Sequence, residues 1–509
     1  MSAQELRVSK QTLIQTKTAL DTSFEQAVEK DFVLPDYCPD VFRILKCRVC
    51  PHVTSQSING DKLTVDTEAE IKVMYLSENS SRISLLEHKL SFTKTLDLGS
   101  CTAPIITASA ALDYVNCRVV NQRRVDIRGA FTVKVKVEGE SRMGFVTAAE
   151  GAGIQLRKAP AVYPAERLTA SKRITVIEEL ELGGAKPPIG AVLRTDCRIE
   201  PGEQRVIQGK LITKGEAMID LLYTPTEQSE EMACTMRFGL PFSQIIDIEG
   251  IDESFTVTAD ITAAGCEVIP RADEGSRLEC ELVLLISCTA VKYESCEAVT
   301  DAYSTLYDYT AQQSGFTLSG MPRAVCAEFS SGGALKYQDG ELGSVACACC
   351  DCGNVTLREQ DGRSIISGSL TLSAVCRNTQ GGAVYLENEV PFEFPADCRF
   401  AGDINIQVKS CGYQLSDSST VEIKTELTVT GTACDGEGIA PLGEITVDTD
   451  KPVDKDPAYA MKLCYVEAGQ ELWELAKRCR TGIEAIIEEN ELPGGRTESS
   501  GLLLIPLIS

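Results

Sequence analysis

Cysteine is the residue type in this chain whose spacing could bind a metal. Four cysteines lie within the run CACCDC, and two more form a CxxC pair: Cys347, Cys349, Cys350, Cys352, Cys47 and Cys50. Such spacings bind zinc or iron–sulfur clusters when a tight turn presents the thiolates. Both runs lie in alternating, strand-like stretches, where side chains at i and i+3 point to opposite faces. We therefore expect incidental or buried thiols, with no metal and no cofactor, and later oxidation stays open as a second interpretation.

Acid–base catalysis has few candidate residues. The two histidines, His52 and His88, lie outside nucleophile-elbow and zinc-peptidase motifs. The acidic candidates are adjacent pairs: Glu178–Glu179, Glu230–Glu231 and Glu488–Glu489. Glycosidase carboxyl groups face each other across a cleft at about 5–10 Å, which neighbours in sequence do not. We therefore expect solvated acidic faces and no enzyme.

The elements that could position a binding site lie in residues 461–509. The run KLCYVEAG predicts a strand and a turn at Gly469, and ELWELAKRC has the apolar spacing of a helix. A second helix is predicted in GIEAIIEEN with Thr481 as its N-cap, and LLLIP predicts a closing strand. Trp473, the only tryptophan, is expected to pack between helix and sheet.

This β-α-α-β order resembles the LysM family of modules that bind N-acetylglucosamine polymers. The matching positions are Tyr465, Val466, Gly469, Leu472, Trp473, Ala476, Ile483, Ile486, Asn490, Leu492, Leu504, Ile505 and Pro506. The resemblance implies a ligand groove between two loops. Its residues would be Ala468, Gly469, Gln470, Glu471 and Leu472 in one loop, and Asn490, Glu491, Leu492 and Pro493 in the other.

The first of these loops departs from the family pattern. Gln470 and Glu471 stand where the family has Asp followed by Thr or Ser, so a carboxylate replaces a small hydroxyl beside the expected glycan. Two ligands therefore stay open for the module: a peptidoglycan or chitin-like glycan, and a protein. Cys464 and Cys479 are candidates for a pair within the module.

The first 440 residues repeat. Leu63 and Tyr75 recur as Leu211 and Tyr223, 148 residues later, within long alternating runs that predict antiparallel strands. A weaker third copy is offset by a further 153 residues. We expect a mainly β chain of tandem antiparallel, β-sandwich-like repeats at 1–165, 166–310 and 311–440 (degenerate), then a linker at 441–460 and the LysM-like βααβ module at 461–509.

The repeats also resemble the SPOCS family of spore-coat morphogenetic proteins. The matching runs are VEKDFVLPDYCPDVFRIL, VMYL, VVNQRRVDIRG and VTDAYSTLY. The resemblance implies a scaffold in the mother-cell cytosol, at the forespore surface. It also implies a LysM module that docks onto the coat's ATP-hydrolysing basement-layer protein (SpoIVA-like).

Composition and connections narrow the partners. The net charge of −25 argues against nucleic acid, and no apolar run is long enough for a signal peptide or a membrane span. We expect the first connection between repeats within residues 138–169. Pro452 and Pro457 predict an extended linker that holds the module at variable distance.

Three functions follow as hypotheses. The first is a non-enzymatic scaffold whose C-terminal module recruits a protein, with self-assembly of the repeats possible. The second is a peptidoglycan-binding protein of the cell wall or spore cortex. The third, a glycan hydrolase, lacks an acid–base constellation.

Overall fold

The computed structural model describes residues 5–78, 82–184, 186–226, 229, 231–271, 276–402, 404–434, 438–455 and 459–507. Strands make up 75% of the structure, and two short helices occur among the described residues, so the predicted mainly β fold is confirmed. Glu230 and Pro457, two of the residues considered above, lie outside the described ranges.

The first repeat is a sandwich of two three-stranded antiparallel sheets. Its strands are β1 (Arg7–Val33), β2 (Arg43–Asn59), β3 (Lys62–Leu76), β4 (Ile83–Asp97), β5 (Ile105–Asn121) and β6 (Arg124–Glu150). One sheet has the order β1-β6-β5 and the other β2-β3-β4. Apolar residues alternate along β3, so that Leu63 and Ile71 are buried in the same core as Ile127 and Phe131 of β6.

The second and third repeats have the same strand order. The second contains β7 (Ile154–Glu181), β8 (Ile189–Ile207), β9 (Lys210–Pro225), β10 (Cys234–Asp247), β11 (Phe255–Pro270) and β12 (Arg277–Ser304). The third contains β14 (Pro322–Lys336), β15 (Leu342–Gln360), β16 (Arg363–Asn378), β17 (Ala383–Pro395), β18 (Asn405–Leu415) and β19 (Thr420–Cys434). Their sheets are β11-β12-β7 with β10-β9-β8, and β14-β19-β18 with β15-β16-β17.

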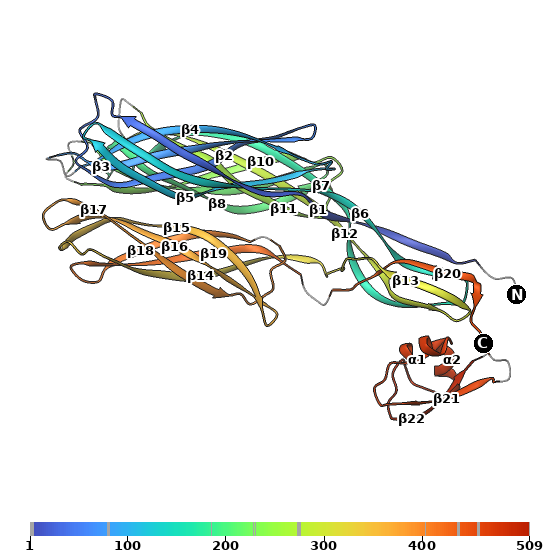
Figure 1. The fold of residues 1–509 in the computed structure, drawn as a ribbon. Coiled ribbons are helices and arrows are strands. Elements are labelled where there is room, and N and C mark those ends of the chain that lie inside the picture. Colours follow the sequence, from blue (N-terminus) through green and yellow to red (C-terminus); the bar gives the residue numbers. More distant parts are fainter. Residues whose placement is uncertain are drawn as a thin grey trace.

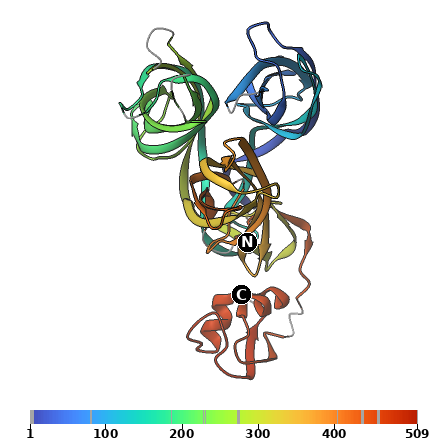
Figure 2. The same ribbon diagram turned by 90° about the vertical axis from the view of Figure 1, so that its left-hand side faces the viewer.

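A β-bulge recurs at one position in all three repeats. The register of the second strand skips Leu45 in β2, Leu193 in β8 and Ala346 in β15. These positions are 148 and 153 residues apart, the two offsets of the sequence repeat. The three sandwiches lie side by side, and Figure 2 shows them end-on with the third repeat below the other two.

Apolar residues join the three repeats where the third strand of each one ends. Met74, Leu222 and Val375 occupy equivalent positions in β3, β9 and β16 and share one buried cluster with Leu193. The ends of these strands are therefore buried on both faces. This explains why the alternation of β3 gives way to the continuous run VMYL.

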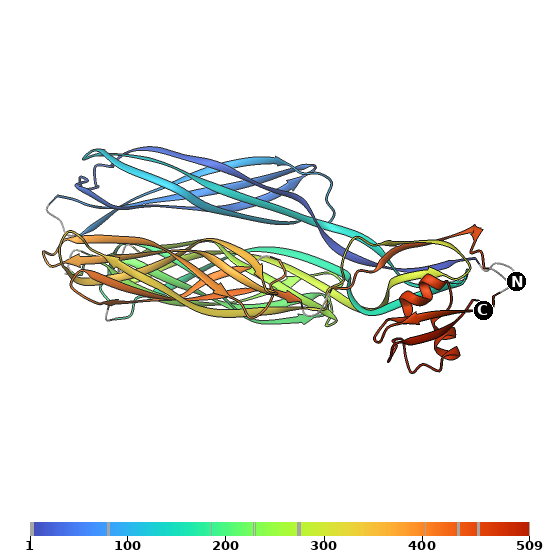
Figure 3. The same cartoon turned by 60° about the horizontal axis from the view of Figure 1, so that its bottom comes forward.

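Three two-stranded ribbons extend from the sandwiches. The first halves of β1 and β7 pair with the second halves of β6 and β12, and β13 (Tyr307–Gln313) pairs with β20 (Leu442–Pro452). The ribbons pack together through two clusters, one of which contains Leu13, Phe145 and Tyr163. Figures 1 and 3 show this narrower end beyond the sandwiches.

The first connection between repeats lies within the expected residues 138–169, but the expected domain boundary and the expected linker differ from the structure. The first connection is the turn at residues 151–153, so the expected boundary at 165 lies inside β7. Pro160 and Pro164 are compatible with this strand because β7 is an edge strand paired only with β12. Residues 442–452 of the expected linker form β20, because Ile445 and Leu442 are buried against the other ribbons.

The C-terminal module has the β-α-α-β order. Its elements are β21 (Met461–Val466), α1 (Leu472–Cys479), α2 (Ile483–Glu489) and β22 (Gly501–Pro506), with β21 antiparallel to β22. Val466 and Ile505 on the inner face of the sheet pack against Leu475 and Ile486 of the helices. The N-cap of α2 is Gly482 and not Thr481, whose side-chain oxygen is buried without a hydrogen-bond partner among the described residues.

Candidate functional site

Trp473 joins the module to the repeat body. It is 7% exposed, as expected, but its ring packs edge-on against Tyr303 of β12, with the ring centroids 5.0 Å apart. Tyr303 is fully buried in the same cluster as the core of the module. The module and the end of the second repeat therefore share a hydrophobic core, and the expected variable distance between them is wrong.

Polar contacts surround this shared core. Asp301 of β12 accepts hydrogen bonds from Trp473 Nε1 and Lys477 Nζ, both at 2.7 Å. Tyr303 donates its hydroxyl proton to the Thr481 carbonyl at 2.7 Å. Arg480 donates to the backbone carbonyls of Ser304 and Tyr307. We call residues 301–309 the seat of the module.

A further contact of Arg480 and the electrostatics of Asp301 complete the seat. The Arg480 guanidinium lies over the Tyr309 ring, 4.6 Å from its centroid, in cation–π geometry. Partial burial alone would raise the pKa of Asp301, but the hydrogen bonds from Lys477 and Trp473 outweigh it, so that its pKa is lowered. The seat therefore contains a charged carboxylate.

The two expected ligand loops are largely engaged in holding the module together. Gly469, at φ +82°, donates its N–H to the Thr497 carbonyl, and Leu472 is buried. Asn490 accepts from the Leu504 N–H at 2.7 Å and donates to the Leu504 carbonyl at 2.6 Å. Asn490 therefore ties α2 to β22, which gives its side chain a structural role.

The remaining loop positions differ in their exposure and contacts. Ala468 donates its N–H to Ser500 Oγ at 3.0 Å, and Gln470 donates its N–H to Thr497 Oγ1 at 3.0 Å. Glu491 has a positive φ of 50° at the turn after α2, and Leu492 packs on the module core. Of the nine expected residues, Glu471 and Pro493 line a surface cleft.

This cleft lies between the module and β7 and has a volume of about 760 Å³. Leu156, Arg157 and Lys158 of β7 form one wall, and Trp473, Ile483 and residues 493–498 of the module form the rest. Glu471 is ion-paired with Arg157 at 3.0 Å and with Arg496 at 2.7 Å. Hydrogen bonding to Arg496 and the charge of Arg157 lower the pKa of Glu471. The residue that departs from the LysM pattern thus binds the repeat body.

The outer face of the module's sheet is apolar and uncovered. Its residues are large hydrophobic side chains exposed by 37–66%: Met461, Leu463, Tyr465, Leu502 and Leu504. Leu463 lies directly opposite Leu504, and Tyr465 opposite Leu502, which makes the patch continuous. In Figure 1, α1 and α2 lie toward the ribbons, whereas β21 and β22 lie on the far side of the module. We call this patch the outer face.

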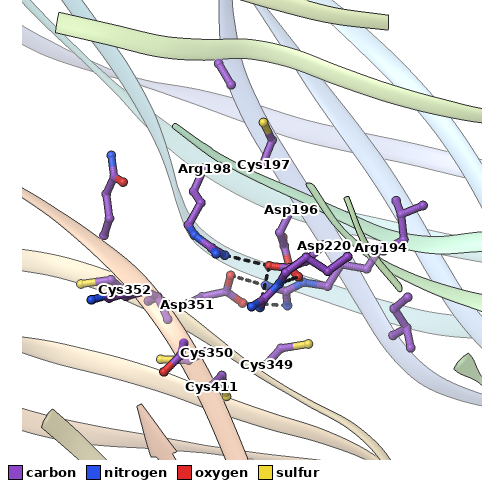
Figure 4. A pocket seen from close by; sticks show the side chains of 18 of the residues that line it. Arg194, Asp196, Cys197, Arg198, Asp220, Cys349, Cys350, Asp351, Cys352 and Cys411 are labelled. Atoms are coloured by element: carbon purple, nitrogen blue, oxygen red, sulfur yellow. Dashed lines mark hydrogen bonds and ion pairs between the residues drawn. The ribbon is translucent and has the colours of Figure 1, made fainter. Parts of the chain in front are cut away.

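A second pocket, of about 730 Å³, lies between the second and third repeats (Figure 4). Arg194 donates two hydrogen bonds to Asp351, at 2.7 and 3.0 Å, and is also paired with Asp196. Arg48 of the first repeat lies 3.2 Å from Asp196 and 3.3 Å from Asp351. Burial would raise the pKa of Asp351, but Arg194 and Arg48 lower it. These four residues link all three repeats, and we call them the junction cluster.

The cysteines of the CACCDC run lie in β15, with Cys347 and Cys349 on one face and Cys350 and Cys352 on the other. Cys347 and Cys350 are buried, whereas Cys349 and Cys352 are partly exposed. Cys47 and Cys50 lie in β2, and all 22 cysteines are free thiols. Within the described residues, no cluster of three or more His, Cys, Asp or Glu side chains could hold a metal ion.

The other candidates from the sequence are structural or solvated. His88 packs edge-on against Phe32, and His52 lies 3.7 Å from Glu68. Burial, followed by the charge of Lys30, lowers the pKa of His88. The acidic pairs within the described residues are exposed: Glu178, Glu179, Glu231, Glu488 and Glu489.

Sequence reasoning missed the seat. Asp301 and Tyr303, which lie in the run VTDAYSTLY, contact the module from a strand more than 160 residues earlier. An acidic and an aromatic residue at the end of an otherwise apolar strand were the available signal. Sequence alone did not reveal their partner.

Comparisons with known proteins give one match. Residues 40–120 and 188–269 match the family model described as SipL, SPOCS domain, and these segments cover β2–β5 and most of β8–β11. No curated protein and no solved structure matches the chain. Among the described residues, no helix is long and apolar enough to cross a membrane. Two segments of this chain, one in each of the first two repeats, are thus similar to the SPOCS domain of the SipL family.

Proposed function

We propose that this protein is a non-enzymatic scaffold of the bacterial spore envelope, and that its LysM-like module docks onto a coat basement-layer ATPase (SpoIVA-like). The match of two repeats to the SPOCS domain supports a role in sporulation. The proposed location is the mother-cell cytosol at the forespore surface.

The observation that carries the docking role is the outer face. Monomeric proteins rarely leave contiguous apolar patches of this kind uncovered, and such patches commonly mark protein interaction sites. The helices of the module are held by the seat, so that the opposite side of the module is free to meet a partner. The body would then act as a long support that fixes the direction of the docking surface.

A paired substitution on the outer face tests this role. Leu463→Glu combined with Leu504→Glu in the full chain places two carboxylates opposite each other, and we expect affinity for the purified ATPase to fall at least ~10-fold. Ile177→Glu is a matched control because Ile177 and Leu463 are both 62% exposed on strands. Undiminished binding by the double variant would contradict docking through the outer face.

Deletion of the whole module tests whether the module docks at all, separately from whether docking uses the outer face. A chain lacking residues 461–509 should lose capture of the ATPase, since the module carries the docking surface. If this deletion binds normally, the module is not the docking element at all. If the deletion fails and the double variant binds, another surface of the module is used.

The cleft between the module and β7 supports a second function, the binding of peptidoglycan or another N-acetylglucosamine polymer. Glu471 and Pro493, one residue from each of the two loops for which the LysM resemblance implies a glycan groove, line this cleft together with Trp473. Gly494 lines the cleft, and a Cβ built on it meets no atom within 4 Å, so Gly494→Tyr should narrow the cleft without disturbing the fold. Saturable sedimentation with purified peptidoglycan that Gly494→Tyr removes would favour this function over the first.

A further inference from the structure

Each sandwich has one seam where the edges of its two sheets meet through their second and fifth strands. The neighbours are β2 and β5, β8 and β11, and β15 and β18. These strands belong to different sheets in the strand order, so no hydrogen-bonded ladder joins the edges at the seam. A covalent bond there would connect the two sheets directly.

Cysteines lie on both sides of this seam at equivalent positions in the second and third repeats. Cys197 and Cys350 each follow the bulged residue of the second strand, Leu193 or Ala346, by four positions. In each fifth strand, one residue is skipped in the register with the sixth strand. Cys266 and Cys411 each lie two positions after this skipped residue. Because both positions recur in two repeats, the placement of these thiols is unlike a chance arrangement.

The first repeat has its pair one step along the same seam. Val49 and Val115 occupy the positions equivalent to Cys197 and Cys266, and the thiols are at Cys47 and Cys117. Moving back two residues on β2 and forward two on β5 keeps two side chains opposite each other when the neighbouring strands run antiparallel. The first repeat therefore has a seam pair in a shifted register.

In each pair, one thiol contributes to the pKa shift of the other. The neighbouring Cys117 and burial raise the pKa of Cys47, and the same contact lowers the pKa of Cys117. Cys197 is the first cause of the raised pKa of Cys266, and Cys411 adds to the effect of burial on Cys350. Figure 4 shows Cys350 and Cys411 beside each other at the pocket.

We propose that these three seams are oxidation sites, at which a small disulfide such as oxidised glutathione converts Cys47–Cys117, Cys197–Cys266 and Cys350–Cys411 into disulfides that staple the two sheets of each repeat. One thiolate of a pair attacks the small disulfide and releases one thiol. The second thiolate then attacks the mixed disulfide at the protein sulfur and releases the other thiol. Each pair loses two protons and two electrons, and the small disulfide is reduced to two thiols.

Cys117 fits the role of the attacking residue in the first repeat. It is partly exposed, whereas Cys47 is buried. A thiol of lowered pKa has the larger thiolate fraction and reacts first, and the buried partner completes the bond. Each disulfide would close a loop of about 60–70 residues, which restricts the unfolded chain strongly.

The experiment is a disulfide map of the full-length protein. The reduced protein is exposed to oxidised glutathione and digested without reduction, and linked peptides are identified by mass spectrometry. We expect the three seam links, a loss of six of the 22 free thiols to these links, and a higher urea midpoint for unfolding. Cys47→Ser should remove the first link alone and leave Cys117 free.

Cys288 and Cys376 provide matched controls. Both are buried, and burial alone raises the pKa of each, to about 11. They should stay reduced, and Cys288→Ala or Cys376→Ala should leave the three links unchanged. The proposal is overturned if the folded protein keeps its seam thiols free in both oxidised glutathione and diamide. A link within one sheet, Cys266–Cys280, in place of Cys197–Cys266 would overturn it for the second repeat.

Discussion

At the scale of single residues, Asp301 holds the module through two donors. Its carboxylate is 22% exposed and accepts from Trp473 and Lys477 on one face of α1. Charge-assisted hydrogen bonds of this kind contribute about 1.5–3 kcal/mol each when they are well shielded, and less where solvent reaches them. Because Trp473 is the only tryptophan, its fluorescence reports on the seat without a label.

Acid should release the module from its seat. The pKa of Asp301 is lowered in the folded protein, so its contribution is present above the unfolded value of about 3.9 and is lost as the pH falls through the folded value. We expect Trp473 emission to stay constant from pH 7 to about 4 and to shift to longer wavelength below that range.

Asp301→Asn provides the control for this titration. The amide still accepts one hydrogen bond but carries no charge, so the variant should show red-shifted emission already at pH 7 and lack the further shift that the natural protein shows below about pH 4. Asp308→Asn removes only a 3.5 Å pair with Arg480 at a carboxylate that is 60% exposed, and should titrate like the natural protein. Emission of Asp301→Asn identical to that of the natural protein at every pH would show that this carboxylate does not hold the seat.

At the scale of elements, local sequence patterns were sufficient to predict the strands and helices, which depend mainly on neighbouring residues. Alternation predicted the strands, and the helical spacing around Trp473 and Ile486 predicted the βααβ order. The pairing partners could not be predicted from the sequence, because β20 pairs with β13, about 130–145 residues earlier, and no property of residues 442–452 identifies that partner. The expected boundary at 165 lies inside β7, because an edge strand tolerates Pro160 and Pro164.

The same contrast between predictable local structure and unpredictable long-range contacts holds for the candidate site. The sequence predicted that the two module loops lie next to one another. Asn490, which was expected to bind a ligand, instead links α2 to β22 through its hydrogen bonds. Glu471, which differs from the family pattern, forms ion pairs with Arg157 of the repeat body and with Arg496 of the module. The positions of the loops in the sequence did not show which surface of the module would contact the repeat body.

One element-level feature common to the first two repeats should be measurable. Tyr75 and Tyr223 end the third strand of each repeat and donate to the carbonyls of Pro39 and Pro187, both at 3.1 Å. Tyr75→Phe should lower the free energy of unfolding by about 0.5–1.5 kcal/mol, since the hydrogen bond from the buried Tyr75 side chain to the Pro39 carbonyl is lost. Urea unfolding checks the value, and Tyr223→Phe should add to it because the two sites share no partner. Strongly non-additive effects of the two substitutions on the free energy of unfolding would contradict the independence of the two sites.

At the scale of the whole molecule, the three repeats form one body because charged and apolar contacts meet at their junction. Met74, Leu222 and Val375 supply the apolar part, and the junction cluster supplies opposite charges from all three repeats. Equivalent positions carry different residues: Arg48 in the first repeat corresponds to Asp196 in the second and Cys349 in the third. The charges therefore match in one arrangement of the repeats, which favours a single order around the junction.

Arg194→Leu should weaken the contact between repeats more than the repeats themselves. Its side chain is 10% exposed, and its removal leaves Asp196 and Asp351 with Arg48 alone. The cost should stay below the about 3–5 kcal/mol of a fully buried pair, because these carboxylates are 38% and 46% exposed. Arg198→Leu is the matched control, because Arg198 is 17% exposed and pairs with Asp220 and Glu200 of its own repeat. X-ray scattering should show a larger radius for Arg194→Leu than for Arg198→Leu, with strand content unchanged by circular dichroism. Equal radii would mean that the apolar cluster alone holds the three repeats together, and that the charges at the junction set no preference for their order.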